Sequence, residues 1–433
     1  MPFETIIHHP KRVAVIGGGI SGMGAAHMLA PECRVTLFEA APRLGGHART
    51  IMAGKNGNQP VDTGFLVFNY KNYPLMAELF ADLSVPVVKS NMSFGASIGG
   101  GRLEYGLASL NALFAQRSNA LNPRFLGMIR DIARFNKSAL RIANQDRTRT
   151  LGAFLSVLGT GDWFRKYYLL PLSGAIWSTP VEKIMEFPAH ALIQFFENHA
   201  LLNATGQHQW YTVDGGSIEY VRRLQTAMHR NGVDIRLNAP IQAVRRTPIG
   251  VEVKARGGVW ESFDEVIFAT HSDDSLALLS DPTTAETRAL SAIKYQPNDV
   301  VLHRDQSIMP KRRQTWSSWV YTEDTDARSD RIDLTYWINS LQPVPMDDPH
   351  FVTLNTKRTI REERIYDQTT LRHPVYDLAA LAAQESVRAM NGANHTWFCG
   401  AWMRHGFHED GLASAVDVIQ TLTRAASRQA TAA

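Results

Sequence analysis

A glycine-rich motif directly after a short apolar run constrains this chain more than any other feature of its sequence. Residues 13–16 read Val-Ala-Val-Ile, and Gly17, Gly19 and Gly22 follow in the pattern G-x-G-x-x-G. A strand that turns tightly into a helix beginning near Ser21 is the arrangement that uses these glycines. Gly17 permits the turn, Gly19 lets a diphosphate approach the backbone, and Gly22 lets the helix pack on the strand. Because free N–H groups at a helix N-terminus favour anions, the segment predicts a dinucleotide site.

A second apolar run supports this interpretation and indicates which dinucleotides the site can bind. Residues 35–38 end at Glu39, about 20 residues after the motif, where an acid accepts hydrogen bonds from a ribose 2′-hydroxyl. A carboxylate there disfavours a 2′-phosphate, so NADP is not expected. A glycine cluster alone is also typical of an ordinary turn, but strand, motif, helix, strand and acid in this order favour a dinucleotide. The motif does not separate NAD from FAD.

The residues after the second strand distinguish FAD from NAD. Gly45 and Gly46 offer another backbone surface for close ligand approach, and Arg43 and Arg49 can pair with a phosphate or a flavin carbonyl. This stretch resembles the FAD-binding start of the flavin amine oxidase superfamily, whose usual pattern is R-x-G-G-R. His47 stands where the second arginine is usual, and Arg49 is the expected substitute for it.

The C-terminal part carries motifs that the same resemblance relates to FAD. Residues 396–400 read as an apolar strand ending in glycine, a loop with two histidines follows, and residues 413–423 have a helical pattern. This order resembles the closing FAD motif of the superfamily, whose helix N-terminus points at the flavin pyrimidine or the pyrophosphate. Asp410 and Gly411 match its acid and its glycine.

Two segments between these ends match further parts of the family pattern. Residues 264–270 resemble its A-T-G strand, with His271 in place of the glycine, and residues 238–244 are expected to form the strand whose backbone meets adenine. Cys399 lies in an apolar run, so FAD is expected to bind noncovalently, and no metal-ligand spacing is present. The expected FAD-binding residues are Gly17, Gly19, Ile20, Ser21, Gly22, Glu39, Ala40, Arg43, Gly45, Gly46, His47, Thr63, Gly64, Phe65, Ile241, Ala269, Gly400, Asp410, Gly411 and Leu412.

The resemblance covers nearly the whole chain and narrows to one bacterial subgroup. Residues 61–69 (VDTGFLVFN), 169–180 (LLPLSGAIWSTP) and 406–412 (GFHEDGL) are similar to predicted NAD/FAD-binding proteins linked with cyclopropane-type or methyl-branched (furan) fatty acid modification. The resemblance implies an α/β fold, in which a Rossmann-type, amine oxidase-like FAD-binding domain is interleaved with an α+β substrate domain.

The domain plan is therefore expected to be discontinuous. Residues 105–200 have mostly helical apolar spacing, with Asn122 as a helix cap before Pro123. Residues 295–355 alternate between apolar and polar side chains, which predicts antiparallel strands forming the floor of a substrate cavity. The FAD-binding domain is expected in 11–85, 205–290 and 390–425, and the substrate domain in 86–204 and 291–389.

Composition and charge favour a cytoplasmic enzyme. The chain of 433 residues is 44% hydrophobic and 20% charged, and a net charge of +4 is small enough that nucleic-acid binding is not expected. Cys33 and Cys399 cannot form a disulfide framework, which fits a reducing compartment. The N-terminus lacks the apolar core of a signal peptide, and no apolar run is long enough to span a bilayer.

One cluster of positive charge points to a membrane partner. Eight Lys or Arg residues and two acids lie from Arg117 to Arg149. A basic amphipathic helix can lie on the anionic inner face of a membrane, where each nearby charge contributes about 1 kcal/mol. The favoured alternative is that its apolar stripe packs into the protein and the charges form a solvated face. The sequence does not define the oligomeric state.

The expected chemistry follows from the flavin, which accepts a hydride at N5. Amine oxidases of this family hold a water near N5 through a lysine and flank the amine with aromatic rings. The comparable stretch, residues 297–302, has no lysine, and Lys294 lies earlier. Phe407 and Trp402 stand in place of the aromatic pair. Both departures argue against simple amine oxidation.

Two histidines of the closing motif are the candidate catalytic residues. His405 and His408 are expected near the flavin, where a group with a pKa near 6.5 can take a proton as hydride leaves; otherwise they only hydrogen-bond backbone or phosphate. The leading hypothesis is an FAD-dependent dehydrogenase or desaturase of a long, methyl-branched acyl chain, which requires an apolar tunnel. The alternatives are an amine oxidase that releases peroxide and an FAD- and lipid-binding partner protein without turnover.

Overall fold

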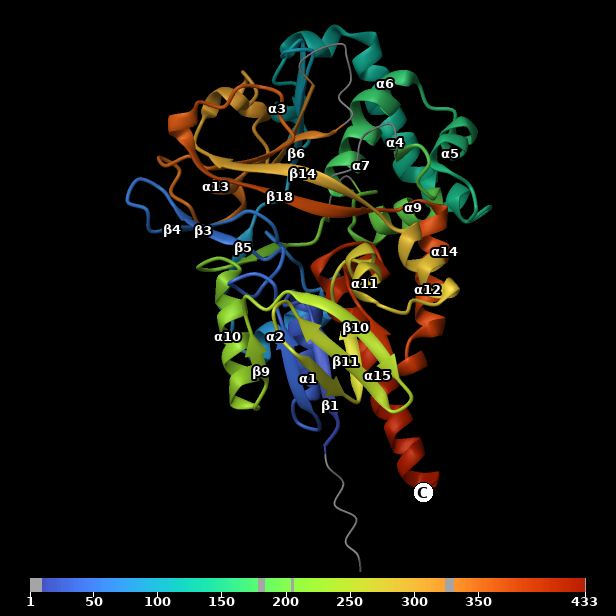
Figure 1. The fold of residues 1–433 in the computed structure, drawn as a ribbon. Helices are drawn as coiled ribbons and strands as arrows, with labels where there is room; N and C mark the ends of the chain where they lie inside the picture. Colours follow the sequence, from blue (N-terminus) through green and yellow to red (C-terminus); the bar gives the residue numbers. More distant parts are fainter. Residues whose placement is uncertain (1–9, 178–183, 204–205, 324–330, 433) are drawn as a thin grey trace, which may run out of the picture.

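The computed structural model describes residues 10–177, 184–203, 206–323 and 331–432, the last eight by backbone alone. A five-stranded parallel sheet in the lower half of Figure 1 carries the glycine motif, in the order β19-β13-β1-β2-β9. Ile16 lies level with Phe38 and Phe268, so the strands end along one edge, where open α/β sheets bind ligands. The bounds are β1 Arg12–Ile16, β2 Arg34–Phe38, β9 Asp234–Arg236, β13 Glu265–Phe268 and β19 Thr396–Phe398.

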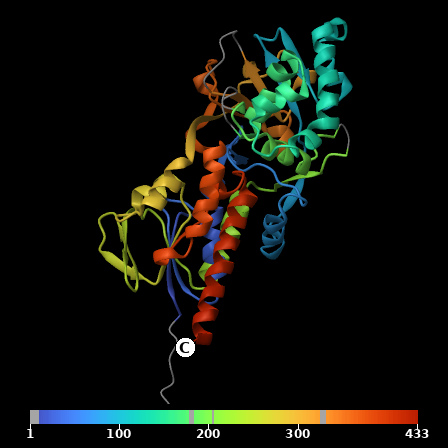
Figure 2. The same ribbon diagram turned by 90° about the vertical axis from the view of Figure 1, so that its right-hand side faces the viewer.

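Alternate residues of β1 face two different layers, as the period of a strand requires. Val13 and Val15 pack on the helical layer, whereas Ala14 and Ile16 pack on a layer that contains a three-stranded antiparallel sheet. Figure 2 shows the long helix α15 beside the parallel sheet. The helical layer contains α1 Ile20–Leu29, α2 Pro74–Asp82, α10 Ile218–Arg230 and α15 His408–Ala432; the other contains β10 Ile241–Thr247, β11 Gly250–Ala255, β12 Trp260–Phe263, α11 Ser272–Leu278, α12 Thr284–Ala292 and α14 Leu378–Met390.

A seven-stranded sheet crosses the upper half of Figure 1, in the order β18-β14-β17-β16-β15-β6-β7. The strands predicted within 295–355 are present and pair antiparallel, but β15 and β6 pair in parallel. The three strands β6, β7 and β18 lie outside the predicted range. The bounds are β6 Phe94–Ile98, β7 Leu103–Gly106, β14 Lys294–His303, β15 Trp319–Glu323, β16 Asp333–Trp337, β17 Phe351–Leu354 and β18 Ile365–Val375.

A helical layer packs on this sheet, as the apolar spacing predicts. The Asn122 side chain accepts hydrogen bonds from the backbone of Arg124 and Phe125, and Pro123 is the first residue of the longest helix of the layer. Phe125 and Phe135 are fully buried in the core that the helices share with the sheet. The bounds are α3 Leu110–Leu113, α4 Pro123–Ala143, α5 Leu151–Leu158, α6 Asp162–Phe164, α7 Leu170–Trp177 and α9 Ala189–Asn198, with short turns η1 Arg117–Leu121 and η2 Arg165–Leu169.

Two two-stranded antiparallel sheets, β3-β4 and β5-β8, complete the strand pairing of the described residues. Strand β8 falls in the range expected for the FAD-binding domain, yet it pairs with β5 from the range expected for the substrate domain. The strand expected at 238–244 begins only at Ile241, because Asn238 has a left-handed backbone. None of the described helices combines the length and apolar character needed to cross a bilayer. The remaining elements are β3 Thr50–Ala53, β4 Gln59–Asp62, β5 Val87–Ser90, β8 Trp210–Val213 and α13 Ile338–Leu341.

Candidate active site

A cavity of about 1080 Å³ extends from the edge of the parallel sheet to the helical layer. Its two ends differ in chemistry. The sheet end is lined by glycines, Glu39 and a group of histidines. The helical end is lined mainly by apolar and aromatic side chains, with Ser93 and Asn136 as polar members; the apolar and aromatic residues are Met92, Phe94, Leu107, Ile132, Tyr168, Leu172, Ile176, Trp319 and Tyr336.

The glycines form a backbone cradle at the sheet end. A Cβ added at Gly19 would meet no protein atom within 4 Å, because Gly19 faces the cavity. A Cβ added at Gly46 would lie 3.1 Å from the Gly19 Cα atom, so the two turns approach each other closely. A Cβ added at Gly22 would lie 1.8 Å from the Gly17 carbonyl oxygen, so Gly22 serves helix packing. This cradle fits a diphosphate at the N-terminus of α1.

Glu39 lies beside that cradle. Its carboxylate accepts hydrogen bonds from the Gly18 backbone N–H at 2.6 Å and the Ala41 backbone N–H at 2.7 Å. The side chain is therefore held in place at the cavity wall. Carboxylate oxygens accept several hydrogen bonds, so a ribose hydroxyl can add to these two.

Replacement of Glu39 by Ala is expected to weaken FAD binding about 10- to 100-fold, because hydrogen bonds to a charged group contribute about 1.5–3 kcal/mol. Titration of apoprotein with FAD, followed by flavin fluorescence, measures the change. Glu252→Ala is the control, since Glu252 lies on β11 and pairs with Arg245 outside the cavity. Equal affinity of the Glu39→Ala protein would refute the ribose assignment.

The two arginines expected to contact the cofactor have other partners. Arg43 donates to the backbone carbonyls of Leu44, Gly46 and Ala48 and so shapes the glycine turn. Arg49 forms an ion pair with Asp367 at 2.5 Å and does not replace the missing arginine at the cavity wall. In this structure Arg43 and Arg49 therefore bind protein groups instead of lining the cavity, where the phosphate or flavin contacts were expected.

Most of the expected FAD-binding residues line the cavity, and two of the others, Asp410 and Gly411, contact residues that do. Asp410 accepts hydrogen bonds from the backbone of His405 and Phe407, and Gly411 packs on Ile20 and Ser21. Those that line the cavity are Gly17, Gly19, Ile20, Ser21, Glu39, Gly45, Gly46, His47, Gly64, Phe65, Ala269 and Gly400; those that do not are Gly22, Ala40, Arg43, Thr63, Ile241, Asp410, Gly411 and Leu412.

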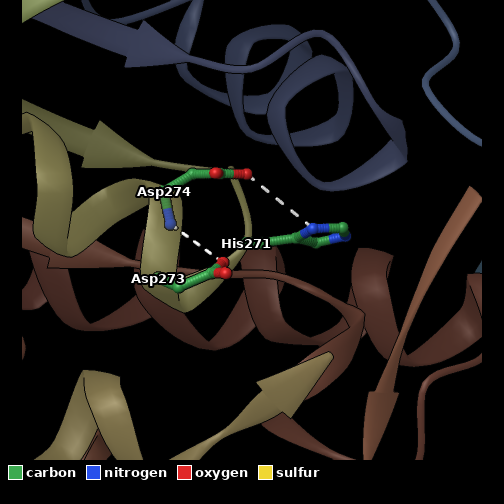
Figure 3. A group of neighbouring side chains, drawn as sticks. All are labelled: His271, Asp273 and Asp274. Carbon is green, nitrogen blue, oxygen red and sulfur yellow. Dashed lines mark hydrogen bonds and ion pairs between the residues drawn. The ribbon is translucent and has the colours of Figure 1, made fainter. Parts of the chain in front are cut away.

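Arg372 is the cationic side chain at the sheet end. Figure 3 shows His271, Asp273 and Asp274 gathered at the start of α11, within reach of a single ion. The guanidinium of Arg372 donates to all three, at 3.0 Å to His271 Nδ1 and at 2.7 and 2.6 Å to the two carboxylates. A cation already satisfies this group, so the geometry is that of an ion-pair cluster.

Four histidines surround the sheet end of the cavity. The ring of His47 lies 5.8 Å from that of His271 and 5.5 Å from that of His373. His408 stacks on Phe65 with ring centroids 4.1 Å apart. Burial lowers the pKa of His47 and lowers those of His271, His373 and His408 to about 3. All four rings are therefore neutral at pH 7.

This neutrality predicts that stability falls with acidification. In the unfolded chain each histidine is protonated below about pH 6.5, whereas in the folded chain His271, His373 and His408 stay neutral down to about pH 3. The free energy of unfolding therefore decreases as the pH falls from about 6.5 towards about 3. Each histidine contributes about 1 kcal/mol per pH unit below 6.5. Urea denaturation of apoprotein at pH 7.5 and 5.5 measures the slope, and His408→Phe should reduce it. A pH-independent midpoint would contradict the expected neutral rings.

A chain of amide hydrogen bonds fixes the proton on His373. The Asp299 backbone N–H donates to Asn355 Oδ1, so the Asn355 amide nitrogen donates to Asn298 Oδ1. The Asn298 amide nitrogen then donates to His373 Nδ1 at 2.9 Å. The His373 proton must lie on Nε2, and His373 lines the cavity as a fixed N–H donor. The sequence does not reveal this chain, because β14 and β18 are far apart in it.

The ring of His199 is the opposite tautomer to that of His373. Its Nδ1–H donates to the Phe195 carbonyl at 2.9 Å, so Nε2 carries a lone pair. The ring stacks on Phe195 with centroids 3.8 Å apart and lines the cavity near Phe407. Burial lowers its pKa to about 4, which keeps it unprotonated at pH 7. No sequence motif singles out His199, since only its neighbours in space distinguish it.

The two histidines predicted as catalytic occupy different positions. His408 Nε2 shares a hydrogen bond of 2.8 Å with the Tyr220 hydroxyl, and the residue begins α15. His405 is exposed at the cavity wall, and its carbonyl accepts from Trp177. Among the described residues no lysine lines the cavity, and the Lys294 ammonium donates instead to the Ser291 carbonyl.

The parallel sheet, the glycine cradle, the adjacent acid and the closing helix together define an FAD-dependent oxidoreductase. The family described as flavin containing amine oxidoreductase matches residues 20–346, and the chain belongs to this family. FAD is the cofactor typical of these enzymes.

Individual relatives resemble the chain in part of the sequence or in the fold. A coproporphyrinogen III oxidase of Mycobacterium tuberculosis is 40% identical over 80 residues, 18% of this chain and 17% of that protein. The chain thus matches less than a fifth of the length of such curated relatives. A fatty acid isomerase from P. acnes has a TM-score of 0.68 at 13% identity, covering 95% of this chain and 98% of the other. A putrescine oxidase variant has a TM-score of 0.68 at 15% identity, covering 95% and 99%.

Proposed function

We propose that the enzyme dehydrogenates a long, methyl-branched fatty acyl chain. The observation that carries the proposal is the apolar helical end of the cavity, which is continuous with the glycine cradle. Glu39 and Asp274 are the acids among the described lining residues, and both belong to the sheet end, so nothing at the helical end offers an anionic partner to an amine. The likeness in fold to a fatty acid isomerase is consistent with an acyl substrate.

The histidines supply complementary proton chemistry in this proposal. FAD held by the glycine cradle and Glu39 would supply the hydride acceptor for the oxidation. His199 Nε2 carries the lone pair that takes the proton lost from the neighbouring carbon, so that two C–H bonds break and one C=C bond forms. His373 offers a fixed N–H donor at the sheet end. The aromatic rings of Phe195 and Phe407 pack beside His199 and would limit the access of water to it.

Anaerobic mixing of the yellow holoenzyme with a methyl-branched unsaturated acyl substrate tests the proposal. The expected result is loss of the oxidised flavin absorbance, together with a desaturated product by mass spectrometry. His199→Phe should slow the loss of absorbance about 10²- to 10⁴-fold without changing the FAD content. If no acyl substrate bleaches the flavin, the proposal is wrong.

The second candidate is an amine oxidase, favoured by the aromatic group next to His405. Phe195 and Phe407 stack with ring centroids 4.9 Å apart, and Trp177 lies 4.8 Å from Phe195. Rings of this kind can flank an amine, and a putrescine oxidase shares the fold. Bleaching by amines alone, with peroxide released in air, would support it. Bound FAD that no acyl chain or amine reduces would indicate a partner protein without turnover.

A further inference from the structure

An exposed apolar surface lies at the helical end of the cavity. Leu107, Leu110, Leu121 and Leu126 expose 38%, 76%, 88% and 43% of their surface. They belong to one segment, residues 107–126, in which α3, η1 and the first turn of α4 pack together around Phe114 and Phe125. We call these four leucines with Arg117 and Arg124 the leucine–arginine face.

The charged side chains within this segment have one sign. The sequence holds no acid between Glu104 and Asp131, whereas Arg117 and Arg124 are exposed. Both flanking acids are buried and partnered: Glu104 forms an ion pair with Arg312 at 2.8 Å, and Asp131 accepts from the Gly161 backbone at 2.8 Å. Exposed leucines beside unopposed arginines match the apolar interior and anionic surface of a bilayer.

The face is continuous with the cavity. Leu107 and Ala108 are both exposed and line the cavity, and Ile132 continues the lining along α4, where Asn136 is the one polar residue of the helix among the described lining residues. Another exposed part of the lining is polar, formed by Asn91, Asn203 and Gln207. A hydrocarbon chain favours the apolar route, because burial of apolar surface is favourable whereas a polar wall would lose its contact with water.

We propose that the leucine–arginine face docks on an anionic phospholipid bilayer, so that an acyl chain enters the cavity between Leu107 and α4 without crossing water. This inference rests on the proposed acyl function and deepens it by naming the source of the substrate. The helix α4 itself packs its apolar stripe into the protein core, so its first turn and the preceding segment, rather than its length, contact the lipid.

Flotation of the holoenzyme with vesicles tests the docking. Vesicles of phosphatidylglycerol and phosphatidylcholine should carry the protein, pure phosphatidylcholine should carry much less, and added salt should release it. A Leu110→Glu/Leu121→Glu protein and an Arg117→Glu/Arg124→Glu protein should each bind anionic vesicles at least about tenfold more weakly.

A matched control uses exposed apolar residues elsewhere. Ile249 and Val259 expose 87% and 76% of their surface in turns of the β10–β12 sheet, at the opposite end of Figure 1 from α3. Ile249→Glu/Val259→Glu should bind vesicles like the unchanged protein. Failure of the holoenzyme to float with anionic vesicles at low salt, or equal loss in the control, would overturn the docking face.

Delivery of the same acyl chain in detergent distinguishes a failure of the docking face from a failure of the proposed function. If this dispersed substrate bleaches the flavin but the protein does not float, the docking face is wrong and the acyl function stands. If the protein floats through the leucine–arginine face but no acyl substrate bleaches the flavin, the face stands without the proposed chemistry.

Discussion

A Gly19→Val protein is expected to fold normally and to purify without the yellow colour of FAD. The backbone of Gly19 is extended, with φ −76° and ψ −177°, a conformation that suits valine. A Cβ at this position would meet no protein atom within 4 Å, and the new side chain would project into the cavity. It would occupy the space through which a diphosphate approaches the helix, so the FAD affinity should fall at least about 100-fold.

The measurements are the ratio of flavin to protein absorbance and the melting temperature of the apoprotein. Gly22→Ala is the matched contrast: its Cβ would lie 1.8 Å from the Gly17 carbonyl oxygen, so this smaller change should destabilise the fold itself. A Gly19→Val protein that retains FAD would show that the diphosphate lies elsewhere.

Replacement of His373 by Ala is expected to lower the flavin reduction potential by roughly 30–60 mV while the FAD content stays constant. The Nε2–H donor that Asn298 fixes at the cavity wall favours negative charge on the reduced flavin ring. A hydrogen bond to a charged group contributes about 1.5–3 kcal/mol, and about 1.4 kcal/mol corresponds to 30 mV in a two-electron couple. Flavin reduction by substrate should slow about 10- to 100-fold.

The position of the proton on the His373 ring can be tested separately. Asn298→Leu keeps the imidazole but removes the donor to Nδ1, so the proton is no longer fixed on Nε2 and the potential should shift in the same direction by a smaller amount. Redox titration against indicator dyes measures both proteins. His395, half-buried beside Glu265 outside the cavity, provides the control substitution His395→Ala. An unchanged potential in the His373→Ala protein would exclude the proposed donor role.

The parts of the site that could be predicted from the sequence are those specified locally. Gly17, Gly19 and Glu39 lie where a contiguous strand–turn–helix–strand pattern places them, because sterics and hydrogen bonds within that segment decide their positions. The contacts of Arg43 are not specified locally. An arginine near a glycine turn can bind a phosphate or the turn itself, and the positions of three backbone carbonyls decide between them.

The reactive end of the cavity depends on long-range register instead. Gln296 pairs with His373 across β14 and β18, and this register brings Asn298 to the His373 ring. Arg372, next along the strand, reaches the acids of α11 for the same reason. A shift of one residue would exchange the two faces of β18. No motif of the chain contains that information, so sequence reasoning favoured the histidines of the closing loop.

The order of strands in the parallel sheet has a consequence for biosynthesis. Strand β19 and helix α15, which come last along the chain, pack beside β13 and α1, which carries the first glycine turn. A growing polypeptide therefore exposes that turn, without its covering helix, until residues near Leu412 have left the ribosome. Such distant pairings slow folding. Capture of the nucleotide should consequently wait until α15 has been synthesised and packed on α1, and the apolar surface exposed before then favours aggregation.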